Sequence, residues 1–85
     1  MNISGIVVDA RMDALPRVRA TLAAMPGVQV HTFSPRGRLV VSIESADEAG
    51  TAAVFGEIQQ LEGVLSAALV FSQWEPDPDG ELIEG

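Results

Sequence analysis

The chain of 85 residues has room for one domain, and its 47% of apolar residues is enough to build a globular core. It contains no cysteine, which excludes disulfides, thiolate metal sites and thiol catalysis. A formal net charge of −7 disfavours nucleic acid and anionic membrane surfaces as partners and favours a basic partner.

The first half of the chain is expected to form a strand, a helix and a second strand. β-Branched residues predict a strand at 3–10, and apolar residues at three- and four-residue spacing predict a helix after it. Asp13 is expected to cap this helix, with Pro16 in its first turn and Gly27 as the left-handed residue at its end. A second strand is expected at 28–33.

The second half of the chain repeats this order. A short turn at 34–37 predicts a hairpin between the second strand and a third strand at 38–44. Residues 45–48 have the spacing of a capping box and predict the start of a second helix, which Gly63 closes. A fourth strand is expected at 64–73.

The domain is expected to span residues 1–74. Residues 75–85 contain two prolines, two glycines and five acids, which predicts a solvated, disordered tail. The opening residues lack a basic start followed by an apolar run, and no apolar segment approaches the roughly 20 residues that cross a bilayer. We therefore expect a cytoplasmic protein that does not insert into a membrane.

An internal repeat indicates how the two halves fold. Val18, Leu22, Met25, Gly27 and Val28 recur 36 positions later as Val54, Ile58, Leu61, Gly63 and Val64. Two strand–helix–strand units with right-handed crossovers predict a ferredoxin-like α+β sandwich of β-α-β-β-α-β order. Its four-stranded antiparallel sheet would have the first and third strands in the centre and both helices on one face.

This architecture leaves the other face of the sheet uncovered. Alternation along the first strand places Val7 and Asp9 on this open face, and alternation along the third strand places Val40, Ser42 and Glu44 there. An apolar patch with a polar rim is typical of interaction sites. Binding of a peptide or partner and face-to-face packing of two copies in a homodimer both fit this pattern.

The fourth strand is apolar nearly throughout, so its pattern alone does not tell which of its side chains face the helices. We place Ala67, Leu69 and Phe71 inside, and Ala68 and Val70 on the open face. The candidate binding surface is therefore Val7, Asp9, Val40, Ser42, Glu44, Ala68 and Val70.

No catalytic, cofactor or metal site is expected. The second strand should expose His31 and Phe33, and His31 is the only histidine, with no second residue to form a triad or a metal site. The absence of lysine excludes a P-loop and a Schiff base. Arg11 and Arg17 follow the first strand, but the connection lacks the glycines of an acylphosphatase anion loop. We expect a protein that is not an enzyme.

Several segments resemble the NapD family, the assembly chaperones of the periplasmic nitrate reductase. They are Gly5-Ile6-Val7-Val8-Asp9-Ala10, Met25-Pro26-Gly27-Val28, Gly37-Arg38-Leu39-Val40-Val41-Ser42-Ile43-Glu44, Leu61-Glu62-Gly63-Val64 and Ala68-Leu69-Val70-Phe71. Together they run through nearly the whole expected domain, and their order and spacing are more specific than any one of them.

The resemblance implies a ferredoxin-like chaperone without a cofactor. Such proteins bind the twin-arginine signal peptide of the catalytic subunit as a helix on the open sheet face, and delay export until the molybdenum cofactor is inserted. On this chain we expect Asp9 and Glu44 to pair with arginines, and Val7, Val40 and Val70 to contact apolar side chains. The alternatives of the same fold are a small-molecule-sensing regulatory domain and a dimerisation module.

Overall fold

Four strands rich in β-branched residues pair into one antiparallel sheet. The computed structural model describes residues 1–74 and contains β1 (Asn2–Ala10), β2 (Val28–Phe33), β3 (Arg38–Ser45) and β4 (Val64–Trp74). Their order across the sheet is β2-β3-β1-β4, so the first and third strands occupy the centre as predicted. The expected tail at 75–85 lies outside the described residues.

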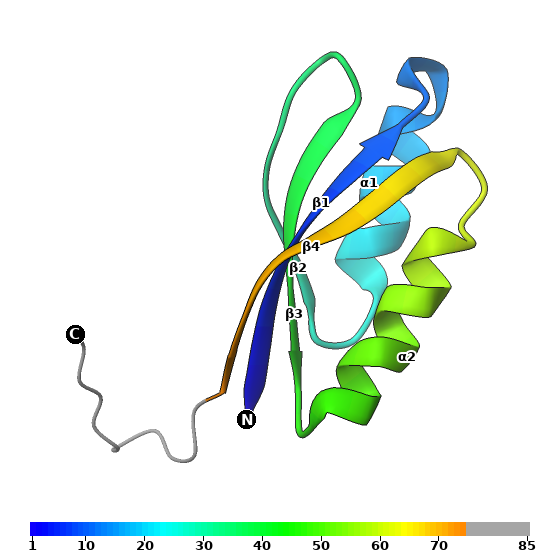
Figure 1. The fold of residues 1–85 in the computed structure, drawn as a ribbon. Coiled ribbons are helices and arrows are strands. Elements are labelled where there is room, and N and C mark those ends of the chain that lie inside the picture. Colours follow the sequence, from blue (N-terminus) through cyan, green and yellow to red (C-terminus); the bar gives the residue numbers. More distant parts are fainter. Residues whose placement is uncertain (75–85) are drawn as a thin grey trace.

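Two helices cover one face of this sheet. A short 3-10 turn, Met12–Ala14, leads into α1 (Leu15–Ala24), and α2 (Glu48–Gln59) connects β3 to β4. Both helices lie on the same side, and no helix of residues 1–74 lies against the opposite side of the sheet (Figure 1). The predicted ferredoxin-like α+β sandwich is confirmed.

The core lies between the sheet and the helices, and it is aliphatic. Alternate residues of β1 and β3 point into it, as the period-two pattern predicted. Burial of each such side chain contributes roughly 1.5–3 kcal/mol. The largest fully buried apolar side chains are Ile6, Val8, Val18, Leu22, Leu39, Val41, Ile43 and Ile58.

The internal repeat corresponds to two equivalent turns after the helices. In the first, the Val28 N–H donates to the Met25 carbonyl (3.2 Å), and Gly27 has the positive φ of 79° that a type II turn needs at its third position. The Gly27 carbonyl accepts from the Glu44 N–H of β3 (2.7 Å). The predicted left-handed glycine is confirmed, although α1 itself ends earlier, at Ala24.

The second turn, 61–64, repeats this geometry. The Val64 N–H donates to the Leu61 carbonyl (3.1 Å), and Gly63 has a φ of 95°. Its carbonyl accepts from the Arg11 N–H just beyond β1 (2.8 Å). Each glycine turn therefore links a helix–strand connection to the end of a central strand through a backbone hydrogen bond.

The start of α2 differs from the predicted capping box by two residues. Asp47 is the N-cap, and its Oδ1 accepts from the Gly50 N–H (2.8 Å). Ser45 instead ends β3, and its hydroxyl lies 2.7 Å from the Asp47 carbonyl and 2.6 Å from the Thr51 hydroxyl. The prediction of a helix start here is confirmed, but its capping residue is the acid and not the serine.

The predicted cap of α1 is wrong. The helix follows Ala14 without a side-chain cap, and Pro16 occupies its first turn as expected. The Asp13 carboxylate accepts from Nε of Arg11 (3.1 Å), and both side chains are largely exposed. The preceding 3-10 turn replaces the cap, because it continues the backbone hydrogen bonding into the helix.

A β-bulge in β2 reverses the expected direction of its last residues. The pairing with β3 shifts between Val30 and Thr32, so His31 is the extra residue. Beyond it, Phe33 pairs with Leu39 and lies on the helix side, where its ring stacks under Arg19. The prediction that Phe33 faces the open side is therefore wrong.

A second bulge does the same in β4. Ile6 pairs with Leu69 and Gly5 pairs with Phe71, which leaves Val70 as the extra residue. Phe71 consequently lies on the open face over Gly5, so the prediction that it faces the helices is wrong. Leu69 precedes the bulge and shares the helix side with its partner Ile6 as predicted, but it is 52% exposed there and not buried. Ala67 packs against the core as expected.

Candidate functional site

The open face of the sheet is built from four rows of side chains that cross the strands at directly paired positions. From one end of the strands to the other, the rows are Glu44–Ile3, then Gln29–Ser42–Gly5–Phe71, then Thr32–Val40–Val7–Ala68, and finally Arg38–Asp9–Ser66. We number them one to four in this order. Six of the seven residues predicted for the binding surface occupy these rows.

Row three forms an apolar centre on this face. Val7 and Val40 are direct partners, and Ala68 pairs with Val7 from the edge strand. Val40 is 38% exposed, although it belongs to a central strand. The seventh predicted residue, Val70, is the bulge residue of β4 and is 58% exposed. A polypeptide laid over row three would remove these apolar side chains from water.

Row four carries a closed ion pair. Arg38 donates from Nε to Oδ1 of Asp9 (3.0 Å), and the Ser66 hydroxyl donates to Oδ2 (3.3 Å). The hydrogen bond and the positive charge of Arg38 lower the pKa of the Asp9 carboxyl below its usual value. Asp9 is therefore already engaged by an arginine of its own chain.

Rows one and two enclose an open hollow of about 530 Å³. In its lining, Nε2 of His31 lies 2.8 Å from the Ser42 hydroxyl. Among residues 1–74 the Glu44 carboxylate has neither an ion-pair nor a hydrogen-bond partner, in contrast to Asp9. The main side chains around the hollow are Ile3, Gln29, His31, Ser42, Glu44 and Phe71.

The role of Phe71 in this hollow was missed from the sequence, although the chain carries a signal for it. A glycine inside a strand often marks a close approach of another group. A Cβ on Gly5 would collide with the Phe71 ring, so glycine at this position leaves room for the ring over β1. A glycine in the first strand opposite an aromatic of the fourth strand is the pattern that could have revealed it.

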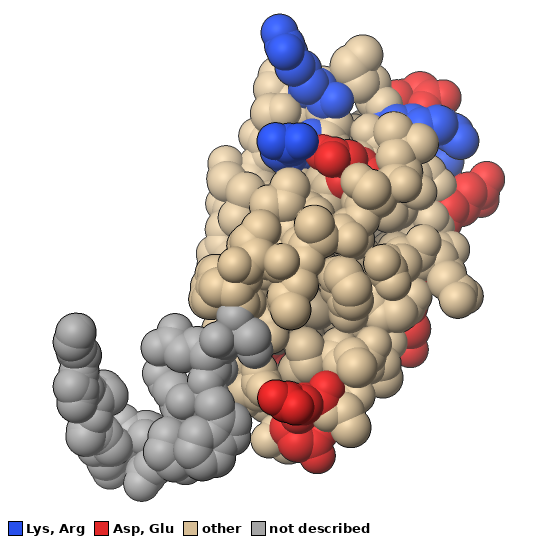
Figure 2. All heavy atoms as spheres, in the orientation of Figure 1, with Lys and Arg blue, Asp and Glu red and all other residues tan. Residues whose placement is uncertain are grey.

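On the face seen in Figure 2, most charged side chains of residues 1–74 lie toward the two ends. Basic and acidic side chains gather at one end and acidic side chains at the other, and the middle is mostly uncharged apart from acidic side chains along one edge. On the open face, the first end carries the Arg38–Asp9 pair and the hairpin turn with Arg36, and the second carries Glu44. The face is thus polarised along its strands.

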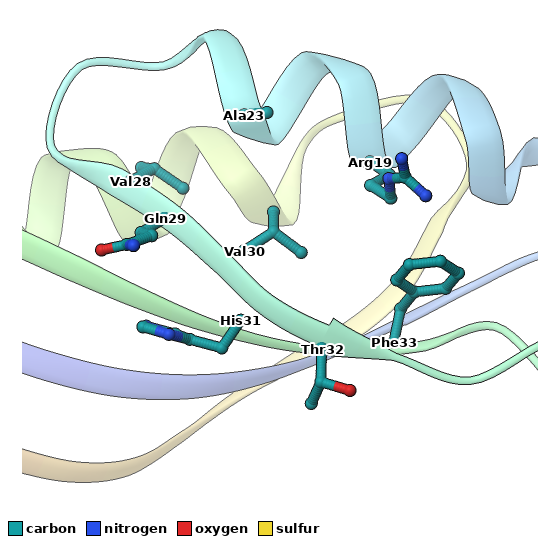
Figure 3. A pocket seen from close by; sticks show the side chains of 8 residues that line it. All are labelled: Arg19, Ala23, Val28, Gln29, Val30, His31, Thr32 and Phe33. Carbon is teal, nitrogen blue, oxygen red and sulfur yellow. The ribbon is translucent and has the colours of Figure 1, made fainter.

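A second hollow of about 510 Å³ lies along the outer edge of β2, beside α1. Val28, Val30 and Phe33 point toward the helix, and Thr32 points to the opposite side (Figure 3). The guanidinium carbon of Arg19 lies 4.5 Å from the centre of the Phe33 ring, a cation–π contact. This hollow presents an arginine and no carboxylate, so it suits a basic partner less well than the open face does.

The described part of the chain offers no metal-binding constellation: no three histidines, aspartates or glutamates in 1–74 converge on one point. Neither α1 nor α2 is long and apolar enough to cross a membrane. The distinguishing feature of residues 1–74 is the open face with its apolar third row.

Comparison with known proteins agrees with this geometry. The family model for the NapD protein matches residues 1–76. A chaperone NapD of Paracoccus pantotrophus is 32% identical over 83 residues, which cover 98% of this chain and 73% of the relative. A chaperone NapD of Escherichia coli K12 is 30% identical over 75 residues, which cover 87% of this chain and 86% of the relative.

A solved structure shows the same fold. The solution structure of the E. coli Tat proofreading chaperone protein NapD superimposes with a TM-score of 0.78 at 28% identity, covering 98% of this chain and 86% of the other. The named relatives are chaperones, which supports a chaperone role and points away from an enzyme. Sequence and fold together show that this chain belongs to the NapD family.

Proposed function

We propose that this chain binds the twin-arginine signal peptide of the catalytic subunit of the periplasmic nitrate reductase in the cytoplasm. It holds the peptide on the open sheet face and so delays export until the molybdenum cofactor is inserted. The work is done by binding alone, because a signal peptide covered by the chaperone is not free for the export machinery. The description of the E. coli relative as a Tat proofreading chaperone supports this proposal.

The observation that carries the proposal is the arrangement of rows one to three. A signal peptide of this class joins a basic start to an apolar segment. The open face offers a carboxylate at row one and an apolar centre at row three, in the same order along the strands. A helical peptide would place an apolar side on Val7, Val40 and Ala68, as helices do in hydrophobic grooves.

Calorimetric titration with the synthetic signal peptide tests the site. Val40→Glu should weaken binding at least about tenfold, because it introduces a charge that the peptide's apolar side would have to desolvate. The fold should persist, because Val40 already meets water. Ala53→Glu on the exposed side of α2 adds the same charge away from the sheet and should bind like the wild type.

Two results would contradict the proposal. The first is wild-type affinity in the folded Val40→Glu variant, which would move the site away from the open face. The second is the absence of any binding to the wild-type chain. A dimerisation module would instead show Val40-dependent self-association in sedimentation without affinity for the peptide, and a ligand-sensing domain would be stabilised by a metabolite.

A further inference from the structure

We infer that the hollow between Glu44 and Phe71 is the subsite for an arginine side chain of the bound peptide, so that the peptide's basic end lies at row one and its apolar segment at row three. This inference rests on the proposed function. It adds the carboxylate that recognises the arginine, the aromatic ring beside that carboxylate, and the direction in which the peptide lies along the strands.

The hollow presents the two groups that recognise a guanidinium. A carboxylate accepts its N–H groups, and an aromatic face attracts its charge. Glu44 supplies a carboxylate that no other side chain of residues 1–74 engages. Phe71 supplies a ring that is 52% exposed and is seated over Gly5, beside Ile3.

The chain's own arginines show both modes of contact separately. Arg38 pairs with the Asp9 carboxylate, and Arg19 stacks on the Phe33 ring. At rows one and two both acceptors line one hollow, and no arginine of the described chain occupies it. An arginine from a partner would complete this site.

The direction follows from the other end of the face. Asp9 in row four is neutralised by Arg38, and Arg36 lies in the adjoining turn. A basic peptide end therefore gains nothing at row four and meets like charge there. Along β1, Ile3 and Val7 are four residues apart, about 13 Å, which corresponds to about nine residues of helix. The apolar contacts should thus begin within about nine residues after the bound arginine.

A double-mutant cycle measured by calorimetry tests the subsite. Glu44→Gln should weaken the wild-type signal peptide about fivefold, and Phe71→Leu about threefold. Neither change should further weaken a peptide whose two arginines are replaced by glutamine. Glu57→Gln removes the same charge from the exposed side of α2 and should leave both affinities unchanged.

The outcomes separate this inference from the proposed function. If no peptide binds the wild-type chain, the proposed function fails. If peptides bind but Glu44→Gln weakens the arginine and glutamine peptides equally, the chaperone role stands and the arginine subsite is wrong.

A spin label reports the direction without altering the subsite. Because the chain has no cysteine, a label on Ala46→Cys marks the row-one end alone, and one on Pro35→Cys marks the row-four end. In NMR spectra of an isotope-labelled peptide, the arginine signals should broaden with the first label and not with the second. The reverse pattern, or equal broadening by both labels, would overturn the direction.

Discussion

Two glycines of this chain should respond in opposite ways to an added methyl group. Gly27 has a positive φ, and a Cβ there would collide with the Glu44 carbonyl. Gly56 lies inside α2, and a Cβ there would meet no atom within 4 Å. The same substitution therefore tests backbone conformation in one case and helix propensity in the other.

We expect Gly27→Ala to lower the free energy of unfolding by at least about 2 kcal/mol, from left-handed strain and the weakened bond to the Glu44 N–H. Gly56→Ala should raise it by about 0.5–1 kcal/mol, since alanine loses less conformational freedom in a helix. Urea unfolding of both variants measures the difference. Destabilisation of the Gly56 variant would show that α2 packs more closely there than the structure indicates.

The Asp9–Arg38 pair should make stability depend on pH. The pKa of Asp9 is lowered in the folded state, so the pair stabilises the fold fully above the unfolded value of about 4. That contribution is lost as the pH falls through the folded-state pKa. The stability difference between wild type and Asp9→Asn should therefore be larger at pH 7 than at pH 3 in urea titrations. Arg38→Gln should remove the same pH-dependent part, and a difference independent of pH would exclude the ion pair as its cause.

At the scale of elements, the two helix starts make a matched test of capping. Asp47→Ala should cost about 1 kcal/mol, because the Gly50 N–H loses its acceptor, whereas Asp47→Asn keeps an acceptor and should be nearly neutral. Asp13→Ala removes an acid that caps nothing and pairs only with the exposed Arg11, so it should cost less than Asp47→Ala. Thermal unfolding of the three variants measures these effects; a large loss in the Asp13 variant would show that the 3-10 turn depends on its side chain.

The central strands could be predicted from the sequence because they alternate without interruption. Leu39, Val41 and Ile43 point inward along all of β3, and Ile6 and Val8 do so along β1. The repeat of the glycine turns then defined the order of elements, and with it the fold. Local pattern and global topology agree wherever a strand is paired on both sides.

The edge strands could not be predicted in the same way. A bulge inserts one residue and reverses the side on which all later residues point. His31 and Val70 carry no sequence mark of a bulge, because each fits the regular strand pattern around it. The two aromatics beyond the bulges, Phe33 and Phe71, were consequently assigned to the wrong faces. The apolar part of the site was predictable, but the presence of Phe71 beside it was not.

For the whole molecule, the distribution of charge differs from what the total suggests. Residues 75–85 contain five of the twelve acids and none of the five arginines, so residues 1–74 carry a formal net charge of only −2. The tail is joined to Trp74, which pairs with Asn2 next to the Ile3–Glu44 row. Most of the net negative charge, −5 of −7, therefore belongs to residues that follow the row-one end of the open face in the chain.

This placement predicts a kinetic role for the tail. A chain ending at Trp74 should unfold at the same midpoint, and it should bind a basic signal peptide with a severalfold slower association rate at low salt, because less negative charge attracts the peptide. Its dissociation rate should be unchanged, since the contacts of rows one to three remain. At 1 M salt, where the screening length is about 3 Å, the two chains should associate equally fast.

Stopped-flow mixing measures these rates, and a variant of the 85-residue chain with the five tail acids replaced by amides should match the shortened chain. A faster dissociation after shortening would mean that the tail itself contacts the peptide, and a rate difference that persists in salt would exclude electrostatic attraction as its cause.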